Sequence, residues 1–196
     1  MTVAVAIETG ARRELDDLTL ARAQQGDATA FQILVETYQD GVFALVWRFL
    51  GRNAQLAEVE DVAQDCFLGV YRSLPRFRPL GAARLSTWIL TIATRAALKE
   101  RRGATRPTVS VDELADVLPS TDATGERLDQ RAFVEALERS LATLAPPYRA
   151  AFLLREYHGF EYQDIAAALE IDLGTVKSRL SRARNQLRDA LKEFAP

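Results

Sequence analysis

The segment Arg155–Phe194 constrains the fold more than any other part of the chain, because its apolar residues recur at helical spacing in two runs. Ile171 separates the runs: Ile165, Ala166 and Leu169 come first, and Val176, Leu180, Leu187 and Leu191 follow. Asp172 precedes the second run, where its carboxylate can accept the backbone N–H of Gly174 or Thr175. A short helix, a tight turn and a capped second helix in this order predict a helix-turn-helix.

The second helix of this motif is strongly basic. Between Gly174 and Lys192 there are six Lys or Arg residues and one acid, and most of the cations lie off the apolar stripe. A helix that packs on its neighbour and carries cations on its outer face suits the major groove of duplex DNA. The alternative is the solvated face of an ordinary helical bundle. The order of the elements favours DNA binding.

Composition limits the class of protein. Of 196 residues, 48% are apolar, which is enough material for one medium core or two small ones. The chain has no apolar run near the roughly 20 residues of a membrane span, and its start lacks a secretory signal, so we expect a cytoplasmic protein without membrane insertion. The single cysteine, Cys66, excludes an internal disulfide and a zinc site of several cysteines, and we expect it in the core.

Charge is divided along the chain rather than spread evenly. The net charge of −2 combines nine bases and one acid in residues 66–106 with six bases and two acids in residues 174–196. Residues 1–65 hold five bases against eleven acids, and residues 107–173 hold five against thirteen. Two basic blocks alternating with acidic ones predict two nucleic-acid contacts on a protein that also meets other surfaces.

Helical periodicity dominates the rest of the chain. Three stretches in the first half repeat their apolar residues at helical spacing: Phe31–Phe49, Glu58–Leu74 and Ser86–Arg101. Asp27 is placed to cap the first of these helices, and Pro75 to stop the second. Ser86 or Thr87 is placed to cap the third.

The predicted fold is all-α, with two small helical domains joined by a flexible linker. An N-terminal extension over residues 1–24 precedes the first domain, residues 25–103. Residues 104–125 are rich in Pro, Gly, Ser, Thr and acids, as is typical of a linker. The second domain, residues 126–194, ends with the helix-turn-helix.

A block of aromatic and basic residues lies just before this linker. It contains two aromatic and seven cationic side chains: Phe77 and Trp88, with Arg76, Arg78, Arg84, Arg95, Lys99, Arg101 and Arg102. Rings that stack on bases and cations that hold phosphates are typical of proteins that bind unpaired nucleic acid. The alternative is a core tryptophan among solubilising arginines. The presence of a separate duplex-binding motif favours the first interpretation.

The chain resembles the extracytoplasmic-function (ECF) sigma factors. Glu60–Phe77 and Ser86–Ala93 look like region 2 of that family, and Gly174–Arg184 looks like its region 4 recognition helix. The resemblance covers residues 25–194 in family order. It implies a non-enzymatic initiation subunit of bacterial RNA polymerase, with no catalytic residue, cofactor or metal of its own.

The resemblance also implies which residues bind. Core RNA polymerase would dock its clamp helices, on the largest subunit, against Asp61, Gln64 and Asp65, and its flap region against region 4. Those acids could equally stabilise a helix N-terminus. In region 2 the −10 element would be opened, and a flipped base captured, by one set of residues: Phe77, Arg84, Ser86, Trp88, Arg95 and Lys99. In region 4 the −35 element would be read in the duplex by another: Arg155, Tyr162, Gln163, Thr175, Lys177, Ser178, Ser181 and Arg182. Promoter DNA and an anti-sigma factor would therefore be further partners.

Two residues depart from the family pattern. Arg95 stands where many relatives have Asn, near the unpaired strand. Glu170 stands in the turn where the family prefers Gly, and a left-handed Glu there costs about 1 kcal/mol. In relatives the linker enters the polymerase channels, where Asp112, Glu113 and Asp116 could mimic nucleic acid; a merely solubilising linker fits equally well.

Two other function classes compete with this reading. A stand-alone helix-turn-helix regulator would explain Arg155–Phe194 but leaves the aromatic-basic block without a purpose. An enzyme has little support. The one histidine, His158, lies between Tyr157 and Gly159, where we expect a surface or turn residue, and the chain has no phosphate loop or nucleophile motif.

Overall fold

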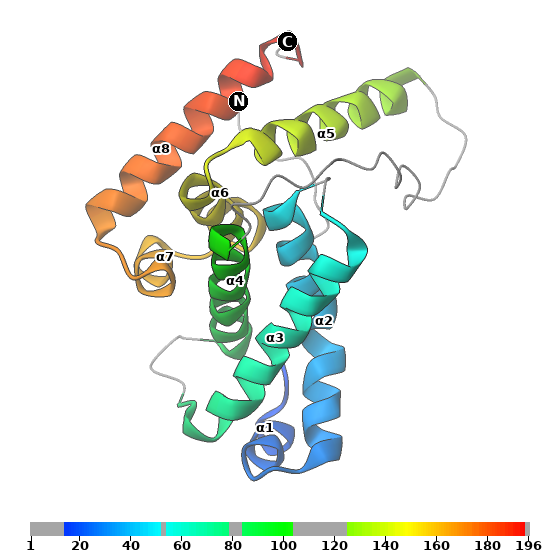
Figure 1. Cartoon of the computed structure of the whole chain (residues 1–196), viewed down its shortest axis with the longest axis vertical. Helices are drawn as coiled ribbons and strands as arrows, with labels where there is room; N and C mark the ends of the chain where they lie inside the picture. The colour runs from blue at the N-terminus through cyan, green and yellow to red at the C-terminus, as the bar shows by residue number, and fades with distance from the viewer. Residues whose placement is uncertain (1–13, 52–53, 79–83, 104–124, 195–196) are drawn as a thin grey trace.

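The computed structural model describes residues 14–51, 54–78, 84–103 and 125–194, and all regular structure in these ranges is helical (Figure 1). Residues 104–124 of the predicted linker lie outside the described residues, and Gly125, its last residue, begins the helix α5. None of the described helices has both the length and the apolar character needed to cross a membrane.

The first half of the chain forms one helical unit. Its elements are α1 (Asp17–Gln24), α2 (Ala28–Leu50), α3 (Leu56–Ser73), the 3₁₀ turn η1 (Leu74–Arg76) and α4 (Leu85–Gly103). The helices α2, α3 and α4 pack on one another around residues such as Val46, Val62 and Ile89. Cys66 lies in this core, as predicted, and burial raises the pKa of its thiol to about 12.

Two of the predicted helix boundaries are confirmed and one is wrong. Asp27 caps α2 by accepting the N–H of Ala30 at 3.0 Å. Pro75 falls in η1, directly after the end of α3. The third helix begins at Leu85, so neither Ser86 nor Thr87 precedes it, and the prediction that one of them caps it is wrong.

The structure also places a helix inside the predicted N-terminal extension. This helix, α1, is capped by Asp16, which accepts the N–H of Thr19 at 2.9 Å. It packs on α2 and η1. Residues 14–24 therefore belong to the first helical unit rather than preceding it.

The second half forms the predicted helix-turn-helix on two supporting helices. Its elements are α5 (Gly125–Thr143), α6 (Pro146–Phe152), the π-helical η2 (Leu153–Tyr157), α7 (Tyr162–Leu169), α8 (Leu173–Ala190) and the 3₁₀ turn η3 (Lys192–Phe194). In the turn, Glu170 adopts the left-handed conformation with φ of 55°. Asp172 accepts the N–H of Thr175 at 2.8 Å and so caps α8, as predicted.

The two units share a packed core. Residues of η2, α7 and α8, among them Leu153, Ile165 and Val176, belong to the same buried cluster as the core of α2–α4. In Figure 1, α7 and α6 lie beside α4, and these helices are in contact.

Arg149 of α6 joins the units from a buried position. Its side chain is 1% exposed, and Nη1 donates to the Phe49 carbonyl at the end of α2 at 2.6 Å. Nη2 donates to the carbonyls of Ala142 and Leu144, which close the α5–α6 corner. Burial lowers the pKa of Arg149 to about 10. One guanidinium thus supplies donors to carbonyls of both units.

Replacing Arg149 by Met should lower the free energy of unfolding by about 2–4 kcal/mol, because Met keeps an unbranched side chain but leaves three carbonyls, two of them in buried hydrogen bonds, without these donors. Urea denaturation followed by circular dichroism measures the change. The control is Arg139→Met, an exposed arginine of α5, which should cost less than about 0.5 kcal/mol. Equal stability of the two variants would contradict the role given to Arg149.

Candidate nucleic-acid interface

The outer face of α8 carries the residues predicted to meet duplex DNA. Buried Val176, Leu180 and Leu187 anchor the opposite face of the helix in the core. Three of the predicted residues, Lys177, Ser178 and Ser181, are exposed on its N-terminal half. The geometry therefore leaves a cation and two small hydroxyls accessible at the end of the helix that usually enters a major groove.

Arg182 is exposed but held toward α6. Its Nη1 donates to the Tyr148 hydroxyl at 3.0 Å, and the guanidinium lies 5.9 Å from the centre of that ring. Thr175 has a structural task as well. Its hydroxyl and its N–H both donate to the Asp172 carboxylate, and these bonds lower the pKa of Asp172.

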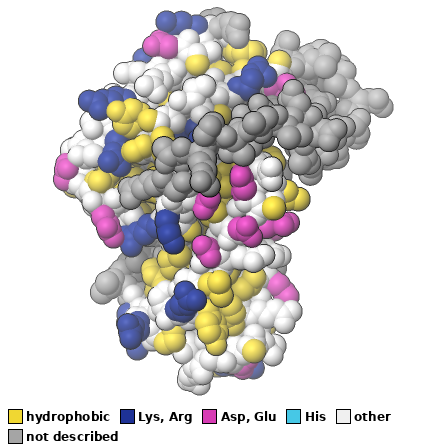
Figure 2. Space-filling model, viewed as in Figure 1, with side chains coloured by type: hydrophobic (Ala, Val, Ile, Leu, Met, Phe, Trp, Pro, Cys, Tyr) yellow, Lys and Arg dark blue, Asp and Glu magenta, His cyan; other side chains and the backbone are white. Residues whose placement is uncertain are grey.

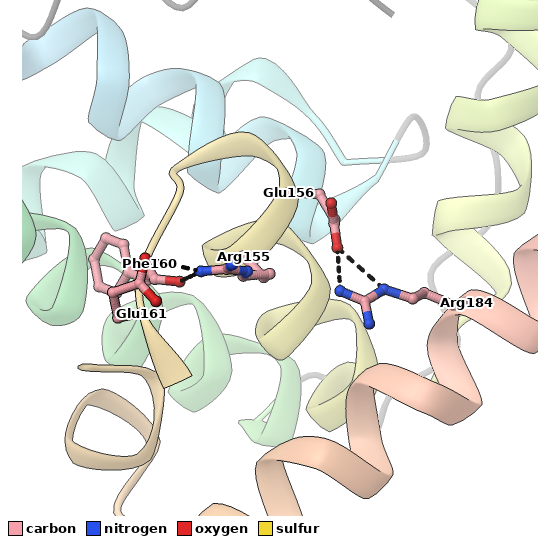
Figure 3. A network of polar contacts seen from close by, with 5 residues as sticks. All are labelled: Arg155, Glu156, Phe160, Glu161 and Arg184. Atoms are coloured by element: carbon pink, nitrogen blue, oxygen red, sulfur yellow. Dashed lines mark hydrogen bonds and ion pairs between the residues drawn. The ribbon is translucent and has the colours of Figure 1, made fainter. Parts of the chain in front are cut away.

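Arg155 and Arg184 each bind a neighbouring group within the second unit (Figure 3). Arg155 donates to the Phe160 carbonyl at 2.7 Å and pairs with Glu161 at 3.3 Å, which ties down the chain entering α7. Arg184 pairs with Glu156 at 2.7 Å, and the hydrogen bond raises the pKa of Arg184. Arg155 was predicted to hold DNA, but in this structure its guanidinium already has protein partners.

The two remaining residues of the predicted duplex-binding set lie at the start of α7. Tyr162 is half-buried, with the Arg155 guanidinium 5.2 Å from the centre of its ring. Gln163 is exposed. Gln163 is therefore the accessible polar side chain of this pair.

One face of α4 gathers most of the residues predicted to meet the unpaired strand. Arg84 directly precedes the helix, and Trp88, Arg95 and Lys99 follow at intervals of four, seven and four residues, so they share one helical face. Arg84, Arg95 and Lys99 are exposed, and Trp88 is half-buried. A ring flanked by cations along one face matches the chemistry that binds single-stranded nucleic acid.

Phe77 is buried and packs against the Trp88 ring of this face. Its side chain is 7% exposed, and its ring centre lies 4.7 Å from that of Trp88. Gln24 of α1 holds the backbone there: Nε2 donates to the carbonyls of Phe77 at 2.8 Å and Leu74 at 3.2 Å. Sequence reasoning missed Gln24. The signal that was available is the Asp16…Thr19 capping pattern, which marks the start of α1.

Ser86 is also held by the N-terminal segment. It is 6% exposed, and its hydroxyl donates to the Glu14 carboxylate. The same carboxylate accepts the Tyr38 hydroxyl at 3.0 Å, and burial is the main cause of the raised pKa of Tyr38. Residues 14–24 thus contact both ends of the Phe77–Trp88 segment, a relation that no pattern in the sequence indicates.

Arg95, on the same face of α4, contacts the other unit. Its guanidinium donates to the carbonyls of Ala167 and Ala168 at the end of α7. The side chains of Lys99 and Arg84, by contrast, lie exposed on either side of it along the helix.

The predicted polymerase-docking residues lie on the outside of α3. Asp61, Gln64 and Asp65 are all exposed, and Gln64 lines a groove of about 670 Å³ between α2 and α3. Most of the groove wall is aromatic or aliphatic: Phe31, Val35, Phe43, Ala63, Phe67, Leu68 and Tyr71. Figure 2 shows hydrophobic side chains gathered over this part of the molecule, with acidic side chains next to them.

Other kinds of site are not evident in the described part of the chain. Among those residues, no three His, Cys, Asp or Glu side chains lie together as a metal site would need. His158 is half-buried at the end of η2. The candidate sites in the described residues are therefore surfaces: the faces of α8 and α4 and the groove between α2 and α3.

Sequence comparison with known families identifies both units. Residues 34–107 match the family described as Sigma-70 region 2, and residues 134–187 match Sigma-70, region 4. The chain is 36% identical to the RNA polymerase sigma-H factor of Pseudomonas aeruginosa, over 91% of this chain and 95% of that protein. It is 32% identical to the ECF RNA polymerase sigma-E factor of Haemophilus influenzae, over 90% and 95% of the two chains.

Two solved structures share the fold. One is CnrH in complex with the cytosolic domain of CnrY, with a TM-score of 0.62 and 21% identity over 91% of this chain and 97% of that chain. The other is the sigma factor RpoE of Bartonella quintana in complex with the anti-sigma factor NepR, also at 0.62, with 22% identity over 83% and 96%. With two sigma regions in order and relatives matched over nearly their whole length, the chain belongs to the ECF family of RNA polymerase sigma factors.

Proposed function

We propose that the protein directs bacterial RNA polymerase to promoters with two spaced elements, and that α8 and α4 divide the work. The observation that carries this proposal is the presence of two nucleic-acid faces on separate units, an exposed basic face on α8 and a basic, aromatic face on α4. The family is not a class of enzymes. We assign no catalytic residue, and opening is driven by binding of the unpaired strand.

The face of α8 reads the −35 element in the duplex. Lys177, Ser178 and Ser181 meet bases and nearby phosphates, and Arg182 adds base discrimination when it leaves Tyr148. Gln163 and Tyr162 anchor the backbone at the start of α7, and Arg155 and Thr175 hold the motif in shape. This division follows the general rule that phosphate contacts set the register and base contacts select the sequence.

The face of α4 opens the −10 element and holds its unpaired strand. Trp88, supported by Phe77, stacks on a base, while Arg84, Arg95 and Lys99 neutralise phosphates. Ser86 positions the start of the helix through Glu14. Gln24 is a positioning residue in this proposal, because it acts on the strand only through the backbone of Phe77.

Core polymerase docks on α3. Asp61, Gln64 and Asp65 face the clamp helices of its largest subunit, and the apolar groove beside Gln64 receives side chains from that partner. The flap region of the polymerase meets the second unit. Exposed acids beside an apolar groove suit a partner helix that carries basic and apolar residues on one face.

The remaining assignments follow the same scheme. Residues 25–103, extended by α1, and residues 126–194 act as the two functional units in the cytoplasm, with residues 104–125 as the linker that follows the polymerase channels. An anti-sigma factor covers both units when the protein is held inactive. Membership of this family favours the sigma factor over a stand-alone regulator that binds duplex DNA without polymerase.

Run-off transcription with purified core polymerase and a pool of promoter fragments tests the proposal. New start sites that share two spaced motifs are expected only when this protein is added. Tight duplex binding without polymerase, together with no initiation, would instead support the stand-alone regulator.

Arg182→Ala should relax base preference in the −35 element by about 1–3 kcal/mol, because a bidentate arginine contact is lost. Arg188→Ala, which removes an exposed cation further along the same helix, is the matched control. It should weaken binding to all −35 sequences about equally. Holoenzyme binding to a set of −35 variants measures both effects, and an unchanged preference in Arg182→Ala would refute the assignment.

Trp88→Ala should impair promoter opening by about 1–3 kcal/mol and leave duplex binding unchanged, because a stacking platform is lost. Gln24→Glu should impair opening in the same direction, since the isosteric side chain cannot donate to the Phe77 and Leu74 carbonyls. The control is Gln25→Glu, the same change at an exposed neighbour. Permanganate reactivity of unpaired thymines reports opening. If Trp88→Ala lost duplex binding as much as promoter opening, the separate roles assigned to α4 and α8 would be contradicted.

A further inference from the structure

Arg95 and Glu170, the two residues that depart from the family pattern, are in contact with each other. Arg95 Nη2 lies 3.2 Å from Glu170 Oε1, although the residues belong to different units. Arg95 is on the strand-binding face of α4, and Glu170 is the left-handed residue in the turn of the helix-turn-helix. Each unusual residue is thus the partner of the other.

The contact also caps the C-terminal end of α7. The N–H groups of Glu170 and Ile171 both donate to the Ala166 carbonyl. The next two carbonyls, of Ala167 and Ala168, accept instead from Arg95 at 3.0 and 2.9 Å. A guanidinium is well matched to this position, because helix C-termini carry carbonyls without helical donors and a partial negative charge.

The three acceptors around Arg95 resemble a phosphate group in charge and in hydrogen-bonding capacity. One carboxylate and two carbonyl oxygens surround the guanidinium, so the site offers negative charge and several oxygens to a single cation. The Nε and Nη2 donors of Arg95 that contact the end of α7 cannot at the same time hold a phosphate of the promoter strand. Arg84 and Lys99, on the same face, are exposed.

We propose that the end of α7 is an intramolecular substitute for DNA, which withholds Arg95 from the unpaired strand until the two units separate. This inference rests on the function proposed for α4. The units are held together elsewhere: Arg149 donates to the Phe49 carbonyl, and Arg48 pairs with Glu138 at 3.4 Å and lies over the Tyr157 ring. The Arg95–Glu170 contact therefore controls access to one cation rather than cohesion of the whole interface.

The exposure of the two side chains limits how strongly the contact can reduce the affinity for the unpaired strand. The side chains of Arg95 and Glu170 are 48% and 76% exposed, so solvent and salt screen their attraction. Removing the carboxylate of Glu170 should therefore increase the affinity of the free protein for single-stranded −10 DNA by only about two- to fivefold at low salt. The increase should shrink as the salt concentration rises.

The test uses Glu170→Asn in the full-length protein, because Asn tolerates the left-handed conformation and removes the charge. The matched control is Glu161→Asn, which removes an exposed acid paired with Arg155 within the second unit. Fluorescence anisotropy with an oligonucleotide that carries the non-template −10 strand measures affinity. A tighter complex for Glu170→Asn only is expected. An equal gain in affinity in both variants would show that the change in net charge alone causes it, and would overturn the proposal.

A double-mutant cycle separates this proposal from the function on which it rests. In an Arg95→Gln background, Glu170→Asn should have no further effect on strand affinity; an undiminished gain would overturn the inference. A second readout does not depend on DNA binding. Probes at exposed Thr29 and Asn185 should report the same inter-unit distance distribution in Glu170→Asn as in the wild type, because Arg149 and Arg48 still hold the units together; a broader distribution would show that the contact governs cohesion and would overturn the proposal. If run-off transcription fails with the wild-type protein, the proposed function is wrong whatever this distance shows.

Discussion

The buried guanidinium of Arg149 is the interaction on which the arrangement of the two units depends. A cation removed from water must be given hydrogen-bond acceptors, and here the acceptors come from the ends of two helices in different halves of the chain. Because the Phe49 carbonyl belongs to α2 and the Leu144 carbonyl to the α5–α6 corner, satisfying one side chain sets where the units meet. Gly51, at φ of 87°, turns the chain away directly beside this contact.

The closed arrangement has a consequence for both nucleic-acid faces. The outer face of α8 remains accessible, with Lys177 exposed. The face of α4 is engaged at Arg95 by the end of α7. In this arrangement the proposed duplex-reading face of α8 is more accessible than the proposed strand-binding face of α4. The groove that we propose for polymerase docking is lined by residues of α2 and α3, so contact between the units leaves it accessible in the same arrangement.

Local chemistry explains which predictions succeeded. Asp27 and Asp172 were correctly placed as caps, because a short acceptor before an apolar run satisfies backbone donors without any help from distant residues. The left-handed Glu170 was also anticipated, but its partner, Arg95, lies 75 positions earlier in the chain. Ser86 was wrongly expected to cap a helix. Its hydroxyl instead donates to Glu14, and no local pattern could have revealed that distant partner.

The sequence by itself determined α2, α3, α4, the helix-turn-helix and the family, since each of these rests on spacing and capping within a few turns of chain. Only the tertiary structure decided which of the candidate cations face outward. Arg184 pairs with Glu156, Arg155 braces the chain before α7, and Arg95 caps that helix, whereas Lys177 stays exposed. The physical reason is that a guanidinium carries donors in several directions and takes whichever acceptors the folded chain brings within about 3 Å. Those acceptors come from backbone and carboxylate groups that local sequence patterns do not bring together.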